Sequence, residues 1–226
     1  MDNSLLEILN IILLSLRVSG MAVLIGTFIG VPIGTILGLA QFRGKRGLMQ
    51  FVEITLRGFV NTFMGLPSVV VGLLVYLLLT TSGPLGQLGL LHTPTAMIIA
   101  QLIMVIPIIV GITMSAVGSV EKAVREKALS LGATGTQAAW TVLKEARMGV
   151  LTAVIAAFGA AISEVGGILI VGGDMRWVTR TLTTAIVYET DQGNFAFAIS
   201  LGLILLSMAF VVNLILTIIQ LKGVKR

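Results

Sequence analysis

The sequence predicts an all-α membrane protein with about five transmembrane helices, and three observations support this. Of its 226 residues, 56% are hydrophobic and only 11% are charged, whereas a soluble domain is typically about 25% charged. The mean hydropathy is +1.05. Crossing a bilayer takes roughly 20 mainly apolar residues in a helix, and five stretches meet that requirement. They are residues 11–40, 60–80, 95–118, 150–171 and 195–221.

The first stretch is longer than a straight span needs, so it either tilts or bends at Pro32, which lacks an N–H. Four glycines recur in it at every fourth position. A stripe of glycines on one helix face allows another helix to approach closely, either within the chain or from a second subunit. The stripe consists of Gly26, Gly30, Gly34 and Gly38.

The 15 lysines and arginines predict the orientation. Four lie between the first and second stretches, five between the third and fourth, and three at the C-terminal end. Because cytoplasmic loops carry an excess of these residues, we expect a cytoplasmic C-terminus and an external N-terminus, which requires an odd number of spans. The net charge of +5 therefore reports orientation and not nucleic-acid binding. The residues are Arg43, Lys45, Arg46 and Arg57; Lys122, Arg125, Lys127, Lys144 and Arg147; and Lys222, Lys225 and Arg226.

Outside the spans, the sequence predicts short connections only. Residues 41–61 mix charges with spaced apolar residues, which is typical of an interfacial or cytoplasmic helix. The acidic N-terminus does not have the positive charge of a cleaved signal. No connection is long enough for a separate domain, so we expect one transmembrane domain over residues 1–226.

The cytoplasmic stretch 119–149 predicts a helix, a tight break at Gly132–Gly135 and a second amphipathic helix. Two interpretations are open. A helical hairpin that projects from the membrane either docks a soluble partner or is a solvated, charged hairpin without one.

Glu164 is the acidic residue that lies inside a predicted span. An ionised carboxylate in hydrocarbon is costly, so it should face protein or water and is a functional candidate. It either accepts hydrogen bonds from backbone at a break near Gly166 and Gly167, or takes part in gating or proton transfer. Small residues share its helix face, as expected for a packed face: Ala153, Ala157, Ala160 and Ala161.

The sequence does not predict an enzyme. The phosphate loop of ATPases reads G-x-x-x-x-G-K-[ST], and residues 38–45, the nearest approach, have the wrong spacing. Without cysteine, and with His92 as the single histidine, no clustered metal ligands are expected. We expect no cofactor on this chain, and ATP hydrolysis, where it is needed, must come from another chain.

A family resemblance suggests a specific function for the cytoplasmic stretch. Glu126-Lys127-Ala128, three residues, Gly132 and then Val142 resemble the EAA loop of ABC importer permeases, although Lys127 and Val142 depart from the alanine and isoleucine of that pattern. The resemblance implies a type I ABC importer permease fold with a homodimer of permeases. It also implies two ATPase subunits that hold ATP and Mg²⁺, an external substrate-binding protein, and an inner membrane of a bacterium or archaeon. The residues expected to dock the ATPase are Glu126, Ala128, Leu131, Gly132, Ala133 and Thr134.

Further segments resemble oxyanion permeases. Residues 65–72, 162–167 and 170–173 are similar to segments of molybdate-type permeases, and residues 179–190 are most similar to tungstate permeases. The resemblance implies tungstate as substrate, with molybdate and sulfate as alternatives. The candidates for the pathway or gate are Pro67, Ser68, Ser163 and Glu164.

The external stretch 172–193 supplies groups that suit an oxyanion, namely hydroxyls and arginine guanidinium groups. These groups either line the external mouth or form a solvated loop that contacts the binding protein, and we favour the second interpretation. They are Arg176, Thr179, Arg180, Thr181, Thr183 and Thr184.

Two other classes of function compete with an ABC permease. An ion-coupled secondary transporter would use Glu164 as a proton carrier, although the five stretches contain no internal repeat of the kind such transporters have. A membrane scaffold without transport activity is the third class.

Overall fold

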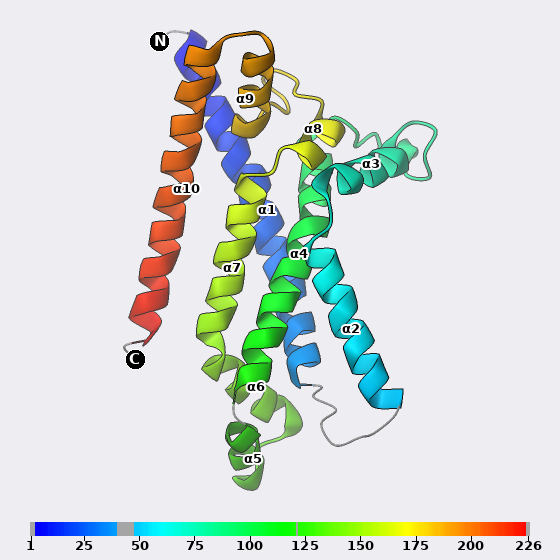
Figure 1. Cartoon of the computed structure of the whole chain (residues 1–226), viewed down its shortest axis with the longest axis vertical. Coiled ribbons are helices and arrows are strands. Elements are labelled where there is room, and N and C mark those ends of the chain that lie inside the picture. The colour runs from blue at the N-terminus through cyan, green and yellow to red at the C-terminus, as the bar shows by residue number, and fades with distance from the viewer. Residues whose placement is uncertain (1–2, 40–47, 121, 225–226) are drawn as a thin grey trace. The chain divides into compact units, whose positions relative to one another are not determined.

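The computed structural model describes residues 3–39, 48–120 and 122–224, and all regular structure in these ranges is helical (Figure 1). Several of the cations that predict orientation, Arg43, Lys45, Arg46, Lys225 and Arg226, lie outside these ranges. The helices are α1 Asn3–Leu39, α2 Leu48–Met64, α3 Ser68–Leu79, η1 Gly86–Leu88, α4 Pro94–Ser119, α5 Lys122–Ser130, α6 Gly135–Glu145, α7 Arg147–Ile162, α8 Gly166–Gly172, α9 Leu182–Asp191 and α10 Phe195–Val224.

Three helices in these ranges are long and apolar enough to cross a membrane: α1, α4 and α10. The number rises to five if two bent helix pairs, α2 with α3 and α6 with α7, each count as one span. Predicted spans 1, 3 and 5 therefore correspond to single helices, and Pro32 lies inside α1 without ending it.

The second and fourth predicted spans are not continuous helices, which corrects the expectation from hydropathy. The stretch 60–80 is interrupted between Met64 and Ser68, because Pro67 has no N–H and disfavours helical backbone in the residue before it. The stretch 150–171 is interrupted between Ile162 and Gly166. The expected helix over 41–61 is present from Leu48 onward as α2, and the residues of that segment before Leu48 lie outside the described part of the chain.

The chain forms two compact units. Unit 1 consists of residues 1–25, 66–105 and 158–215, and unit 2 of residues 26–65, 106–157 and 216–226. Helices α1, α4, α7 and α10 each contribute one part to unit 1 and the other part to unit 2. The prediction of one domain over residues 1–226 stays a prediction.

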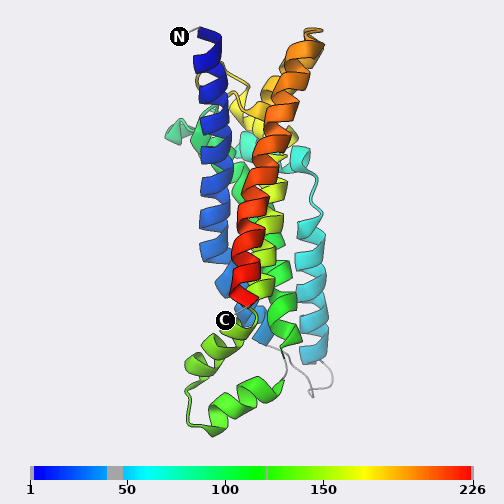
Figure 2. The same cartoon turned by 90° about the vertical axis from the view of Figure 1, so that its left-hand side faces the viewer.

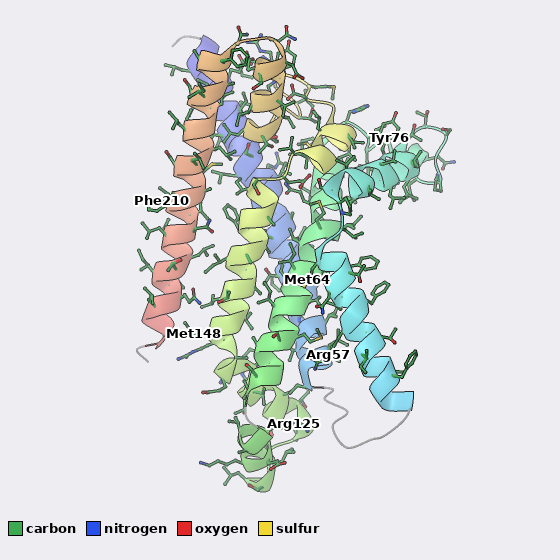
Figure 3. The ribbon with its side chains drawn as sticks, viewed as in Figure 1. Arg57, Met64, Tyr76, Arg125, Met148 and Phe210 are labelled. Atoms are coloured by element: carbon green, nitrogen blue, oxygen red, sulfur yellow. The ribbon has the colours of Figure 1, made fainter. Side chains whose placement is uncertain are left out.

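Unit 1 has two buried apolar clusters. The first joins α1, α3, α4 and α8 around Val18, Val71, Met97 and Val171, and the second joins α1, α9 and α10 around Leu182. Helices α3 and α8 pack directly on each other, as Figure 1 shows. Away from the second cluster α10 exposes apolar side chains, among them Phe210, which is labelled in Figure 3. Exposed apolar surface on a long apolar helix is expected where lipid replaces water.

Unit 2 is built on the glycine stripe of α1. A Cβ atom on Gly30, Gly34 or Gly38 would come within 2.8 Å of a side-chain atom of α4, so the two helices touch through the bare backbone of α1. The stripe therefore packs within the chain, which is the first of the two interpretations. Gly26 is buried on the same helix. Another close contact of α4 is with α2, where the Met64 sulfur, labelled in Figure 3, covers Gly111.

Candidate functional site

The break between α7 and α8 is organised by Glu164, which lies in unit 1 and is only 8% exposed. Its Oε1 accepts a hydrogen bond of 2.8 Å from the Gly167 N–H, and its backbone carbonyl accepts one of 2.8 Å from the Thr183 hydroxyl. The expected hydrogen bond between Glu164 and the glycine pair is therefore present. It satisfies one of the N–H groups that the start of a helix leaves without an intrahelical partner.

The beginning of α3 lies against this break. A Cβ atom on Gly166 would be 3.1 Å from the Ser68 hydroxyl, and one on Gly167 would be 3.0 Å from the Ser68 carbonyl oxygen. Pro67 occupies the N-cap position of α3 and provides no side-chain cap. The folded chain thus brings Pro67, Ser68 and Glu164 together. The N-termini of two interrupted helices meet at this point.

Ser163 does not share this arrangement. Its side chain is exposed, and its hydroxyl donates to the Gly159 carbonyl of its own helix at 2.8 Å. A serine that bonds back to its helix in this way has its donor already in use.

One buried polar cluster of unit 1 was not predicted from the sequence. Gln101 of α4 is 2% exposed, and its Nε2 donates to the Ala161 carbonyl of α7 at 2.8 Å. The Ser19 hydroxyl of α1 donates to the same carbonyl at 3.2 Å. Polar residues inside apolar stretches are the signal that could have found this cluster, since a buried polar group needs a partner.

The threonines of the stretch 172–193 are buried, which differs from the expectation of a solvated loop. Thr179, Thr181, Thr183 and Thr184 are each less than 7% exposed. Thr181 and Thr184 form the capping box that begins α9, and the Thr179 hydroxyl donates to the Gly172 carbonyl at 2.8 Å. Their hydroxyls bond to backbone and side-chain groups of unit 1, and the Thr183 hydroxyl reaches the Glu164 carbonyl. In the chain alone these threonines therefore form no exposed surface.

The two arginines of the stretch 172–193 belong to a four-charge cluster, defined as Glu7, Asp174, Arg176 and Arg180. Arg176 makes two hydrogen bonds to the Glu7 carboxylate. The Arg180 guanidinium contacts Asp174 at 3.1 Å and lies over the Tyr188 ring, with 4.4 Å to its centroid. The Arg180 side chain is only 11% exposed, so it is not part of a solvated loop, whereas that of Arg176 is 57% exposed. The hydrogen bond from Arg176 to Glu7, and then the Glu7 charge, raise the pKa of Arg176 above its ordinary value.

The hairpin that the sequence predicts to be cytoplasmic lies in unit 2 and consists of α5, a turn and α6, as Figure 2 shows. Gly132 has a φ of +84°, which glycine adopts at little cost. The Ala133 N–H donates to the Ala128 carbonyl at 3.1 Å and the Gly132 N–H to the Leu129 carbonyl at 3.0 Å. This pair of bonds is the Schellman arrangement that ends a helix at a glycine. The expected helix, break and helix are thus present.

The second helix of the hairpin begins with a complete capping box. The Gln137 N–H donates to the Thr134 hydroxyl at 3.3 Å, and the Thr134 N–H donates to the Gln137 side chain at 2.8 Å. Between the two caps the turn presents Leu131, 79% exposed, and Glu126 is exposed on the preceding helix. The turn between the two caps thus exposes one large apolar side chain.

Metal chemistry has no site in the ranges that the structure describes, where no group of three or more histidine, cysteine, aspartate or glutamate residues could hold an ion. The ring of His92 instead packs against Gly173, and its backbone N–H donates to the Val171 carbonyl at 2.9 Å.

Three relatives match nearly the whole chain. A "Probable anion ABC transporter permease protein" of Haloferax volcanii is 45% identical over 94% of this chain and 90% of the relative. The "Tungstate uptake system permease protein TupB" of Peptoclostridium acidaminophilum is 37% identical over 95% of this chain and 90% of the relative. The protein of the same description from Campylobacter jejuni is 35% identical over 84% of this chain and 81% of the relative.

Solved structures share the fold. A chain of the MetNI methionine ABC transporter in an inward-facing conformation superposes with a TM-score of 0.79 over 99% of both chains, at 16% identity. A chain of an amino acid ABC transporter superposes with a TM-score of 0.55, at 18% identity, over 97% of this chain and 94% of that chain. The all-helical fold is therefore that of an ABC importer permease.

Residues 30–222 match the family described as "Binding-protein-dependent transport system inner membrane component". Such a system includes an ATPase and a binding protein, and its membrane component is a multi-pass permease and not the ATPase. The secondary-transporter and scaffold alternatives are therefore not supported. On the match over residues 30–222, and on relatives at 35–45% identity that cover most of its length, the chain belongs to the family of binding-protein-dependent inner-membrane permeases of ABC transporters.

Proposed function

We propose that this chain is the permease of an ABC importer for a tetrahedral oxyanion, and that this oxyanion is tungstate. The observation that carries the proposal is the similarity to two tungstate uptake permeases, at 37% and 35% identity, over most of each chain. The relative at 45% identity is described only as a probable anion permease, which supports the same class of substrate. Molybdate and sulfate are the competing substrates, since related permeases carry those descriptions as well.

The meeting of two helix N-termini supports an anionic substrate. The first N–H groups of a helix carry a partial positive charge, and interrupted membrane helices use such ends toward anions. Ser68 begins α3 without a side-chain cap, and the first residues of α8 lie against it. The Glu164 carboxylate is engaged by Gly167. In our proposal this place, with Pro67 and Ser68, borders the pathway, and the positive helix ends offset the repulsion of the carboxylate.

The hairpin of α5 and α6 is the proposed coupling loop. Glu126, Leu131 and Thr134 present exposed side chains at or beside a turn held by two caps. Two copies of the permease would each insert this turn into a cleft of one ATPase subunit, which holds ATP and Mg²⁺. Closure of the ATPase dimer would then move the hairpins and switch access between the two sides. The N-terminus would be external and the C-terminus cytoplasmic.

The external contact with the binding protein is reassigned to the exposed part of the four-charge cluster. Arg176 is the member of that cluster with a largely exposed side chain. An arginine held in place by a carboxylate is preorganised for a polar protein partner.

The test is uptake by proteoliposomes that contain the permease and its ATPase, with binding protein outside and ATP inside. Tungstate uptake that needs both ATP and the binding protein supports the proposal. Calorimetry on the binding protein with tungstate, molybdate and sulfate then identifies the substrate, since delivery begins there. Tight binding of an amino acid, with no affinity for the three oxyanions, would overturn the oxyanion assignment.

A further inference from the structure

An apolar groove on unit 2 has no role in the transport cycle described above. It lies between the second half of α1 and the junction of α6 with α7, and it has a volume of about 480 Å³. A second part of about 310 Å³ shares Val31, Trp140, Leu143 and Val150 with the first, so the two form one continuous groove.

The first part of the groove has the surface chemistry of a site for a hydrocarbon chain. Phe28, Val31, Pro32 and Ile36 of α1 line one side. Thr35 also lines it, but the Thr35 hydroxyl donates to the Val31 carbonyl at 2.7 Å, so this polar group is already bonded. Phe28 is 83% exposed in the chain alone. These residues belong to a helix long and apolar enough to span a membrane, and lipid is a medium that suits so apolar a side.

The second part of the groove ends in positive charge. Lys144 and Arg147 line it, and neither part is lined by an acidic side chain among the described residues. Between the apolar and the charged ends stands Trp140, over whose ring the Lys144 ammonium lies at 5.7 Å from the centroid. Tryptophan is enriched at the level of lipid headgroups, and basic pockets on the cytoplasmic side of membrane helices bind anionic headgroups.

The local fold holds α6 in a position suited to this interface. Helix α6 and helix α7 meet at an angle of 65° next to Ala146. Ala138 and Val142 on α6 are buried, while Trp140 is exposed on another face of the same helix. An amphipathic helix that bends away from a spanning helix is typical of one that lies in the headgroup region.

We propose that this groove binds an anionic phospholipid of the cytoplasmic leaflet, with an acyl chain along Phe28, Val31 and Ile36 and the phosphate at Lys144 and Arg147. Charge complementarity selects this occupant, because a groove with an apolar end and a cationic end matches a molecule with one acyl and one anionic end. The bound lipid would fix α6, and with it the hairpin, relative to the α1 part of unit 2. The inference rests on the proposed orientation, in which the end of the groove at Lys144 and Arg147 is cytoplasmic, but it does not require the proposed substrate.

The test uses Trp140 as the reporter, since the chain contains only two tryptophans. In the full-length variant Trp177→Phe, Trp140 is the single tryptophan, and it is excited selectively over the two tyrosines. The protein is placed in phosphatidylcholine vesicles that contain increasing amounts of brominated phosphatidylglycerol or, in parallel, brominated phosphatidylcholine. Each signal is divided by that in unbrominated lipid of the same headgroup, so direct effects of a substitution on the fluorescence cancel. We expect stronger quenching by phosphatidylglycerol.

Charge variants decide whether the groove causes that preference. Lys144→Gln and Arg147→Gln should each lower the relative association constant of phosphatidylglycerol about fivefold, since a basic residue near the surface contributes roughly that factor. The double variant should bind both lipids equally. The matched control is Lys127→Gln on α5, a cation that does not line the groove, and it should keep the preference.

Other outcomes overturn the inference. Equal quenching by both lipids in the starting variant would mean general contact with the bilayer. No quenching by either lipid would mean that protein covers the groove, either a second copy or another chain. Native mass spectrometry of the intact permease and ATPase complex should show phosphatidylglycerol retained, and lost in the double variant. A complex without retained lipid would also refute the proposal.

Discussion

Gly72 of α3 and Gly167 of α8 lie in such close contact that a Cβ atom on Gly72 would be 2.7 Å from the Gly167 Cα and 2.9 Å from its carbonyl oxygen. Both atoms belong to backbone, which cannot move aside as the end of a side chain can. The two interrupted helices therefore touch backbone to backbone. Because the Gly167 N–H is also bonded to Glu164, this contact positions the carboxylate beside the start of α3.

The first prediction concerns that contact. Gly72→Ala should destabilise the protein by about 1–3 kcal/mol, the usual cost of overpacking a filled site. It should also lower transport, because the added methyl group forces α3 and α8 apart. Thermal unfolding of the purified protein in detergent measures the first effect. The control is Gly202→Ala in α10, where a Cβ meets nothing within 4 Å. Equal unfolding temperatures for the two variants would contradict the close packing.

The second prediction separates shape from charge at the hairpin. Gly132→Ala should cost about 1 kcal/mol locally, because alanine is strained at a φ of +84°, and should weaken coupling of ATP hydrolysis to uptake. Gly132→Asn should be milder, since asparagine tolerates left-handed backbone. Gly132→Asp should tolerate the backbone in the same way but add a charge, and should abolish association with the ATPase. Co-purification with the ATPase and ATP-driven uptake are measured.

The control for the hairpin is Gly135→Ala. Gly135 begins α6, no positive φ is found there, and a Cβ meets nothing within 4 Å. This variant should couple normally. If Gly132→Ala and Gly132→Asp both couple as well as Gly135→Ala does, the hairpin is not the docking element.

The third prediction concerns the role of Glu164. Glu164→Gln retains an oxygen that can accept from the Gly167 N–H at the same position, so uptake should be unchanged and should keep the same dependence on pH. Glu164→Leu leaves that N–H without its partner, which should cost about 1–3 kcal/mol. Uptake as a function of pH and thermal unfolding test the pair. Loss of uptake in Glu164→Gln with normal stability would show that the charge itself is needed.

The fourth prediction ranks the members of the four-charge cluster. Asp174→Asn should destabilise the protein by about 3 kcal/mol, because it leaves a largely buried Arg180 without its nearest carboxylate. Arg176→Gln should have a much smaller effect on stability, since the Arg176 side chain is mostly exposed, but it should reduce capture of the binding protein. Thermal unfolding and a binding assay with immobilised permease distinguish the two. The reverse ranking in thermal unfolding would contradict the assignment of Arg180 as the buried member.

Because the pKa of Arg176 is raised, its ion pair with Glu7 is lost only at a pH above the ordinary pKa of arginine. A base whose pKa is higher in the folded state contributes stability that is complete below its ordinary pKa and is lost as the pH rises through the folded value. Because that range is strongly alkaline for arginine, Arg176 should contribute no pH dependence between neutral and mildly alkaline conditions. A loss of stability near neutral pH that disappears in Arg176→Gln would contradict this.

Some elements of the fold and the site could be predicted from the sequence, because local residue patterns specify them. The hairpin was predictable because a glycine near the end of a helix and a Thr-x-x-Gln start are local signals. The hydrogen bond of Glu164 was predictable because a carboxylate in a span needs a donor and the glycine pair is three residues away. Pro67 indicates the interruption in the stretch 60–80, but hydropathy alone predicts that stretch as one span.

The threonines of the stretch 172–193 could not be placed by such local signals. The stretch that contains them has the polar composition of a solvated loop, but composition does not tell which hydroxyl groups become buried in the fold. These residues are Thr179, Thr181, Thr183 and Thr184. The partner of Thr183 is the Glu164 carbonyl, 19 residues away, and the partner of Arg176 is Glu7, 169 residues away. No local pattern connects residues at such separations.

The sequence by itself determined that this chain is a helical membrane protein with a helical hairpin after its third apolar stretch, because apolar length, charge distribution and turn chemistry act over a few neighbouring residues. That the hairpin is the coupling loop of an ABC permease is implied by the resemblance of residues 126–142. Only the tertiary structure decided which polar groups are enclosed, where the interrupted helices touch, and that the glycine stripe packs within the chain. Those outcomes depend on contacts between distant segments, such as Gly72 with Gly167 and Gly34 with Thr113. Close packing selects such pairs only once the whole set of helices has assembled.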